Sequence, residues 1–170
     1  METNSYETHT LSMLVRNHPG VLSRVSGLFS RRGYNIENLS VGVTEDEKIS
    51  RITIVVVGDK TVAYQITKQL NKLIDVLKIV ILSPENSVSR GIMLVKVKAE
   101  MEKRTQVLQI VDIFRARVID ICSSSLIIEM TGDKSKQEAL LKMLEPFGIM
   151  EISKTGLSGL QRGETTLKGN

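Results

Sequence analysis

The chain has 170 residues and a formal net charge of +4, and 41% of its residues are hydrophobic and 25% charged. These proportions are those of an ordinary globular protein, and the length allows one domain or two small ones. No apolar run reaches the ~20 residues of a membrane-spanning helix, and residues 1–9 have neither a signal-peptide nor a transit-peptide pattern. We therefore expect no membrane contact and a cytoplasmic location, or the plastid stroma if the chain is plastid-encoded or processed.

The charges and the aromatic content argue against a nucleic-acid partner. Basic residues alternate with acidic ones, as in residues 96–104, which is typical of a solvated surface. Aromatic residues make up only 4% of the chain, without Trp, so few side chains are suited to stacking on bases. The single cysteine, Cys122, excludes an intramolecular disulfide and a cysteine metal cluster, which fits a reducing compartment. Because it ends a strand-like run, we expect it to be packed rather than reactive.

The first strand and helix follow a polar start. Residues 1–9 are expected to fray, and residues 10–16 alternate as a strand does. Pro19 is expected to open a helix, because a first helical residue needs no N–H. Gly33 is expected to end that helix as a C-terminal glycine, and Gly27 within it to pack closely on the sheet.

Four further elements complete a β-α-β-β-α-β order. In the strand expected after Gly33, the apolar side chains change from one alternating set of positions to the other near Glu37-Asn38, which predicts a bulge. Asp46 lies in the hairpin turn that follows. The pattern then predicts a strand at 49–57, a helix with its apolar stripe at 62–73 and a strand at 76–82. This order is that of an α+β, ferredoxin-like sandwich, so residues 10–82 are expected to form one domain.

The same order returns after residues 83–90, a polar segment with a proline that we interpret as a linker. Strands and helices are expected at 92–99, 105–115, 118–122, 126–131, 136–144 and 148–153. Gly58-Asp59 and Gly132-Asp133 each precede a helix, which indicates a tandem repeat. Residues 91–170 are therefore expected to form a second ferredoxin-like βαββαβ domain with a tail.

The most informative stretch for function is Asn17-His18-Pro19-Gly20-Val21-Leu22, between the first strand and the first helix. The first N–H groups of a helix have no partner within it, so they favour an anion such as a carboxylate. Gly20 has no Cβ and lets a ligand approach the main chain. The alternative is a plain strand-to-helix turn. The second repeat has no such stretch and carries Asp120 in place of Asn35, so it is not expected to bind the same ligand.

The sequence offers no constellation for catalysis. His9 lies in the segment expected to fray, His18 has no acidic or cysteine partner in the local pattern, and no phosphate-binding glycine loop occurs. RNA-recognition modules share this fold, but here Ile52, Ile54 and Val56 occupy the strand that carries their aromatic residues. We therefore expect a protein that is not an enzyme on its own, without catalytic residues, a metal site or a nucleic-acid partner.

Residues 14–41, which contain Asn-His-Pro-Gly and Arg-Arg-Gly-Tyr-Asn-Ile, resemble the ACT domain of the small, regulatory subunit of acetolactate (acetohydroxyacid) synthase. The resemblance continues in residues 49–59, 91–97, 119–121 and 156–163. A generic ACT domain would match only the first part of the chain. The resemblance implies an N-terminal ACT domain followed by an ACT-like domain.

For function, the resemblance implies a homodimer that binds L-valine or a related branched-chain amino acid between its protomers. It also implies that the dimer activates the catalytic large subunit of acetolactate synthase and confers feedback inhibition on it in branched-chain amino acid biosynthesis. Thiamine diphosphate, Mg²⁺ and FAD would then belong to the catalytic subunit, and this chain would have no cofactor of its own. The alternative is a free-standing ACT-type amino-acid sensor that acts on another partner.

The expected effector-binding residues are Asn17, Gly20, Val21, Leu22, Asn35 and Ile36. The helix start at 20–22 would take the effector carboxylate, and the amide oxygens of Asn17 and Asn35 would accept from its ammonium. Leu22 and Ile36 would supply an apolar wall. In the family the effector lies between protomers, so Asn35 and Ile36 would come from the second chain. His18-Pro19 departs from the family pattern, where acidic or small polar residues are frequent, and this departure would tune affinity.

Overall fold

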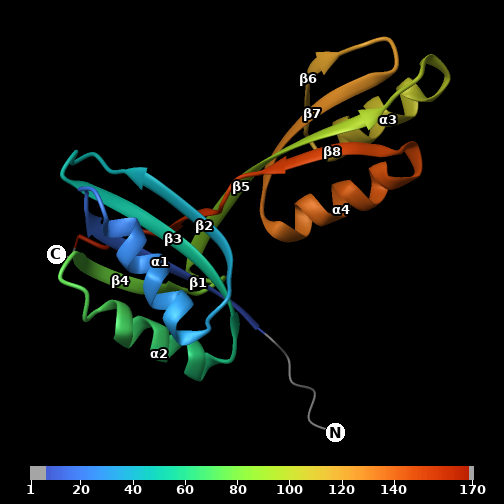
Figure 1. Cartoon of the computed structure of the whole chain (residues 1–170). Helices are drawn as coiled ribbons and strands as arrows, with labels where there is room; N and C mark the ends of the chain where they lie inside the picture. Colours follow the sequence, from blue (N-terminus) through green and yellow to red (C-terminus); the bar gives the residue numbers. More distant parts are fainter. Residues whose placement is uncertain (1–6, 169–170) are drawn as a thin grey trace, which may run out of the picture. The chain divides into compact units, whose positions relative to one another are not determined.

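The computed structural model describes residues 7–168, which divide into two compact units (Figure 1). The first unit contains the chain up to Val88 together with the residues from Gly156 onward, and the second contains Ser89–Thr155. Each unit has an antiparallel sheet with two helices packed on it, in the order expected from the sequence. The α+β, ferredoxin-like architecture predicted for both halves is therefore confirmed.

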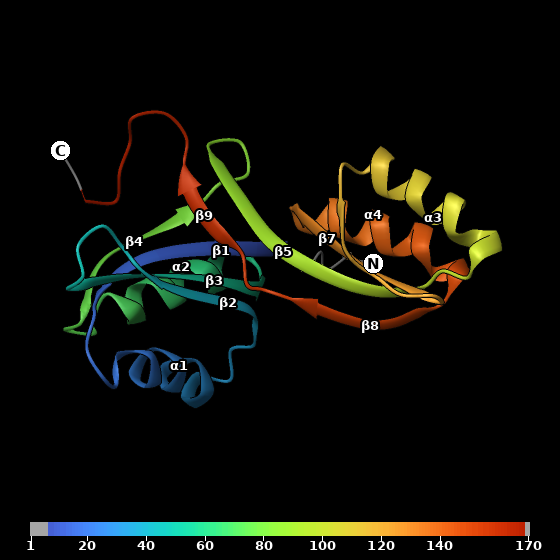
Figure 2. The same cartoon turned by 90° about the horizontal axis from the view of Figure 1, so that it is seen from above.

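The elements of the first unit are β1 (Glu7–Arg16), α1 (Val21–Arg32), β2 (Ile36–Val43), β3 (Ile49–Gly58), α2 (Lys60–Leu70) and β4 (Val76–Leu82). The sheet order is β2-β3-β1-β4, so β2 and β4 are its edges. Side chains from α1 and α2 form one buried cluster with Leu11, Met13 and Val15 of β1, which puts both helices on the same face. Figure 2 shows the same elements turned by 90° from the view of Figure 1.

The bulge in β2 and the C-terminal glycine of α1 are both confirmed. The register of β2 shifts between Ile36 and Asn38, where the parity change predicts a bulge. Gly33 caps α1 with φ 69°, and its N–H bonds back to the last turn. The start of β1 differs from the sequence analysis. Of residues 1–9, which are expected to fray, residues 1–6 lie outside the described range. Residues 7–9 are strand because they pair with the end of β3, from Glu7 opposite Gly58 onward.

The elements of the second unit are β5 (Ser87–Lys98), α3 (Met101–Ile113), β6 (Arg117–Ile121), β7 (Ser125–Gly132), α4 (Lys134–Leu144), the 3₁₀ helix η1 (Glu145–Phe147) and β8 (Ile149–Lys154). The sheet order is β6-β7-β5-β8. Asp133 caps α4 through a bond from Lys136 N, as Asp59 caps α2 through a bond from Val62 N. The Gly-Asp pairs noted in the sequence thus have the same role in both repeats.

The residues after the second repeat belong to the first unit. The sequence analysis places all of 91–170 in one domain, whereas residues 156–168 pack with the first unit, and β9 (Ser158–Gln161) pairs with β5. Leu157 N donates to Asn38 Oδ1 at 2.7 Å, and Lys168 forms an ion pair with Glu45 at 2.7 Å. The predicted linker, 83–90, includes the first residues of β5.

Cys122 is exposed, so the expectation that it is packed is wrong. It follows β6, an edge strand, and its backbone oxygen accepts a bond from Arg104 at 2.6 Å. The same guanidinium donates to the oxygens of Ser123 and Ala99. The Arg104 side chain therefore holds the main chain of the β6–β7 turn against the start of α3. The backbone of Cys122 is fixed in this way, while its thiol lies outside the core.

Candidate functional site: the loop between the first strand and the first helix

The loop that carries the expected anion site ends at a glycine in the left-handed region. Gly20 caps α1 with φ 88° and ψ −11°, a conformation that other residues adopt only with strain. Because Gly20 interrupts the helical geometry, α1 begins at Val21 and Pro19 lies in the turn, so the expectation that Pro19 opens the helix is wrong. The N–H of Val21 makes only a long contact with His18 O, at 3.5 Å. The start of α1 thus keeps weakly used N–H donors.

Asn17 is held by the β2–β3 turn in a way that leaves its acceptor atom available. Its backbone N donates to Lys48 O at 2.8 Å, and its Nδ2 donates to Glu47 O at 2.7 Å. No residue in the described range 7–168 donates to Asn17 Oδ1. An open depression of about 620 Å³ lies beside it, lined by residues 16–18, 46–49 and Leu77. The amide oxygen can therefore accept a bond from a ligand such as an ammonium group.

A cluster of three side chains, those of Asp75, His18 and Arg24, supports the loop from the other side. Asp75, in the turn before β4, accepts from His18 Nε2 at 2.8 Å and from Arg24 Nε and Nη2 at 2.8 and 2.7 Å. His18 Nδ1 also lies 3.1 Å from Pro19 O, so the imidazole ring stands between this backbone oxygen and the Asp75 carboxylate. The sequence analysis found no acidic partner for His18, because Asp75 lies 57 positions away and stands alone in a turn.

Burial acts to raise the pKa of the Asp75 carboxyl, but the hydrogen bonds from His18 and Arg24 and the charges of both groups outweigh it. The pKa is therefore held below its ordinary value. The carboxylate stays ionised at neutral pH and can hold both partners there.

The six expected site residues fall into two groups within one chain. Asn17, Gly20, Val21 and Leu22 lie at the start of α1, whereas Asn35 and Ile36 follow its end. A helix of 12 residues is about 18 Å long, so the two groups cannot meet around one small ligand in a single chain. Asn35 and Ile36 instead stand at the start of β2, an edge strand.

The apolar members of the expected site differ in what they can offer. Val21 is 4% exposed and belongs to the core of the first unit, so it can contribute only its backbone N–H. Leu22 is 42% exposed and its side chain is free to contact a ligand. Ile36 packs partly against the core and keeps part of its surface accessible. An apolar wall from Leu22 and Ile36 is thus compatible with their burial.

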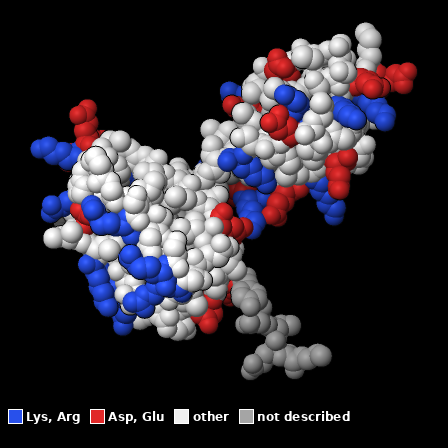
Figure 3. All heavy atoms as spheres, viewed as in Figure 1, with Lys and Arg blue, Asp and Glu red and all other residues white. Residues whose placement is uncertain are grey.

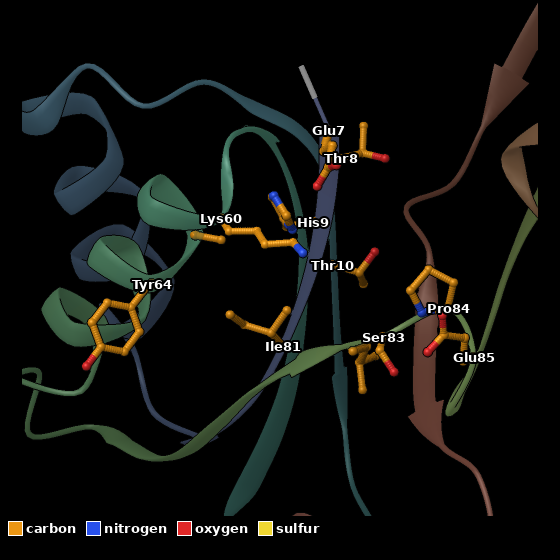
Figure 4. Close-up of a pocket in the computed structure, with 12 residues that line it drawn as sticks. Glu7, Thr8, His9, Thr10, Lys60, Tyr64, Ile81, Ser83, Pro84 and Glu85 are labelled. Atoms are coloured by element: carbon orange, nitrogen blue, oxygen red, sulfur yellow. The ribbon is translucent and has the colours of Figure 1, made fainter. Parts of the chain in front are cut away.

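A larger cavity than the depression beside Asn17 lies elsewhere. Figure 4 shows this pocket, about 920 Å³ in volume, formed by the first residues of β1, the start of α2 and the end of β4 with Ser83–Glu85. His9 at its edge contacts Gly58 O at 3.2 Å through Nε2. Thr10 of the pocket is seven residues before Asn17 along an extended strand, which is roughly 23 Å. None of the expected effector residues lines it.

The first unit carries a basic helical surface. Within α1 and α2 the charged residues are Arg24, Arg31, Arg32, Lys60 and Lys68. Figure 3 shows Lys and Arg side chains gathered over these helices. Among residues 7–168 no helix is long and apolar enough to cross a membrane, and no group of His, Cys, Asp or Glu is placed to hold a metal ion.

Family models match both parts of the chain. Residues 11–78 match the model described as an AHAS small subunit-like ACT domain, and residues 90–163 match the model described as the small subunit of acetolactate synthase. The two matched ranges correspond to the two repeats that the sequence pattern predicts.

Whole relatives are similar over nearly their full length. The chain is 57% identical over 159 residues to the acetolactate synthase small subunit of Mycobacterium bovis, covering 94% of this chain and 95% of that protein. It is 48% identical to the probable acetolactate synthase small subunit of Methanothermobacter thermautotrophicus, covering 95% and 96% of the two chains. The crystal structure of the acetolactate synthase small subunit from Thermotoga maritima superposes with a TM-score of 0.85 at 40% identity, covering 94% and 99%. The chain therefore belongs to the family of acetolactate synthase small, regulatory subunits, with an N-terminal ACT domain.

Proposed function

We propose that this chain binds L-valine or a related branched-chain amino acid between the ACT domains of two copies. In that complex it would activate the catalytic large subunit of acetolactate synthase and confer feedback inhibition on it, without catalysing a reaction itself. Thiamine diphosphate, Mg²⁺ and FAD belong, in this proposal, to the catalytic subunit.

The observation that carries the proposal is the division of the site residues between the two ends of α1. The start of α1 offers a carboxylate the N–H groups after Gly20, and Asn17 Oδ1 offers an acceptor for the ammonium. The far end offers Asn35, just before β2, and Ile36, the first residue of that edge strand. A second copy whose β2 approaches the first copy's α1 would complete the site. An edge strand with exposed Val41 and Val43 is suited to such a contact.

Placing the ligand between protomers also gives it a way to regulate. A ligand that contacts two copies changes how tightly and in what geometry they pack, and a partner that contacts the dimer senses this change. Regulation then requires that the ligand bind two dimer geometries with different affinity.

The test is calorimetric titration of the purified chain with L-valine, L-leucine and L-isoleucine, and with glycine as a ligand that has the same charged groups but no side chain. We expect saturable binding of at least one branched-chain amino acid, near one site per protomer, and none of glycine. Gly20→Asp places a carboxylate beside Arg24, where the ligand's own is expected, and Asn35→Ala removes an ammonium acceptor. Each should abolish valine response.

The matched control is Gly163→Asp, which adds the same charge at another glycine with positive φ, 72°, and open space around its Cβ position. It should bind as the wild type does. Activation of the purified catalytic subunit is measured in parallel for all variants. Valine response that survives both Gly20→Asp and Asn35→Ala would contradict the proposed site. Absence of binding to the wild type, alone and with the catalytic subunit, would contradict the proposed function.

A further inference from the structure

Asp75 contacts the segment between β1 and α1 at three successive points. Its backbone oxygen accepts from Arg16 N at 2.9 Å, its Oδ1 accepts from His18 Nε2, and its Oδ2 accepts two N–H groups of Arg24. One residue in the turn before β4 therefore holds the end of β1, the loop and the first turn of α1. On the opposite side of the loop, the partners of Asn17 within residues 7–168 are the main-chain oxygens of Glu47 and Lys48 in the β2–β3 turn.

The Asp75 side chain is 8% exposed, whereas those of His18 and Arg24 are 45% and 49% exposed. A carboxylate taken out of water loses hydration that its partners must replace, so a buried ion pair is a weak way to stabilise a fold. In some proteins such a pair instead selects one conformation among several. Here the conformation that it selects is that of the loop and of the Arg24 side chain.

The position of the Arg24 guanidinium determines how this cluster can affect ligand binding. Its Nε and Nη2 both donate to one oxygen of Asp75, which fixes the plane of the guanidinium. Its remaining nitrogen, Nη1, lies 3.4 Å from the point where a Cβ on Gly20 would stand. The cation is thus held beside the main chain at the start of α1. Without Asp75, a long and half-exposed side chain would sample many rotamers.

We propose that Asp75 is a positioning residue of the effector site. It orders the loop through His18 and holds the Arg24 guanidinium beside Gly20, where the carboxylate of an amino-acid ligand is expected. The inference rests on the proposed function and adds to it a residue 57 positions from the motif. When the loop is already ordered before the ligand binds, the free energy of binding does not include the entropy cost of ordering it, so the affinity is higher.

The test compares the dissociation constants of L-valine for the full chain and for Asp75→Asn, Arg24→Gln and the double variant. Asp75→Asn keeps the size of the side chain and removes its charge. We expect each single variant to bind valine about tenfold more weakly or worse, because the loop and the cation are no longer held. If Asp75 acts through Arg24, the double variant should have about the same dissociation constant as whichever single variant binds valine less tightly. Losses that multiply in the double variant overturn the inference.

The matched control is Asp112→Asn, the same change at an exposed carboxylate on α3 in the second unit, and it should bind as the wild type does. The free energy of unfolding is measured for every variant, because a merely structural role would lower it without coupling the two losses of affinity. If Asp75→Asn fails to fold, Arg24→Gln alone decides, and wild-type affinity in that variant overturns the inference. When the wild type binds valine and Asp75→Asn binds it equally well, only this inference fails. When the wild type binds no branched-chain amino acid, the proposed function fails.

Discussion

At the scale of single residues, Asp75 makes the stability of the first unit depend on pH. Its pKa is lower in the folded chain than its ordinary value of 3.8, because bonds from His18 and Arg24 outweigh the effect of burial. A carboxylate with a depressed pKa stabilises the fold above its unfolded pKa, and this contribution is lost as pH falls through the folded pKa. The stabilisation is therefore complete at neutral pH and disappears in acid.

The check is urea unfolding of the wild type and of Asp75→Asn at several pH values between about 7 and 3. The wild type should be the more stable at neutral pH, and the difference should shrink as the pH falls below about 4. A difference that stays constant over this range would show that the charge of Asp75 does not contribute.

Gly27 has no structural need to be glycine. The sequence analysis expects it to pack closely on the sheet, but a Cβ there would meet only Arg31 Nη1, at 3.9 Å, so that expectation is wrong. Alanine in a helix interior is more favourable than glycine, and Gly27→Ala should stabilise the first unit by about 0.5–1 kcal/mol. Gly33→Ala is the contrasting variant, because its φ of 69° strains any side chain, and it should destabilise. Urea unfolding of both variants measures the free energy of unfolding, which should rise in Gly27→Ala and fall in Gly33→Ala.

At the scale of elements, the C-terminal segment is held closely against β2. A Cβ on Gly156 would collide with the backbone of Leu39, and the next residue, Leu157, donates its N–H to Asn38. Gly156→Ala should push the segment off the strand and destabilise the first unit by about 1–3 kcal/mol. Hydrogen exchange at Leu157 should then accelerate. Gly42→Ala, on the same strand with open space at its Cβ position, should leave that exchange rate unchanged.

Elements with a regular period were predictable, and those fixed by distant contacts were not. β3 lies within one residue of the predicted range, 49–57, because Ile52, Ile54 and Val56 alternate and a strand beside an apolar core places every second side chain inward. The segment at 156–168 has three scattered leucines and no period, so nothing in it indicates that it packs on the first sheet. The signal lay in β3, where the unbroken apolar run 54–57 is typical of a strand buried on both faces.

The candidate site likewise contains residues that a local motif predicts and a residue that only the tertiary fold brings there. Asn17 and Gly20 belong to a short motif whose geometry follows from local rules, because a left-handed cap favours glycine and a free helix start favours an anion. Asp75 belongs to no motif. Its role arises because the sheet brings the turn before β4 next to the end of β1, and a single aspartate in a turn has no sequence signature.

At the scale of the whole molecule, the proposed site needs two chains, and this can be tested by complementation. If Asn17–Leu22 of one chain meet Asn35 and Ile36 of another, a two-fold dimer has two such sites. In a heterodimer of Gly20→Asp and Asn35→Ala chains, both changes fall in one site and the other site is intact. Each homodimer has both sites damaged.

We therefore expect neither variant alone to bind valine, and the purified heterodimer, obtained with two different affinity tags, to bind with one intact site per dimer, about half the wild-type capacity. The affinity of that site should equal the wild-type affinity, because none of its residues is changed. Calorimetric titration of the three species measures both quantities. If instead the ligand contacted both residue groups within one chain, each chain of the heterodimer would carry a damaged site and binding would not return. Recovery of binding would thus show that Asn35 and Ile36 of the partner chain complete the site. A ligand bound in this way contacts both protomers and therefore controls the spacing between them.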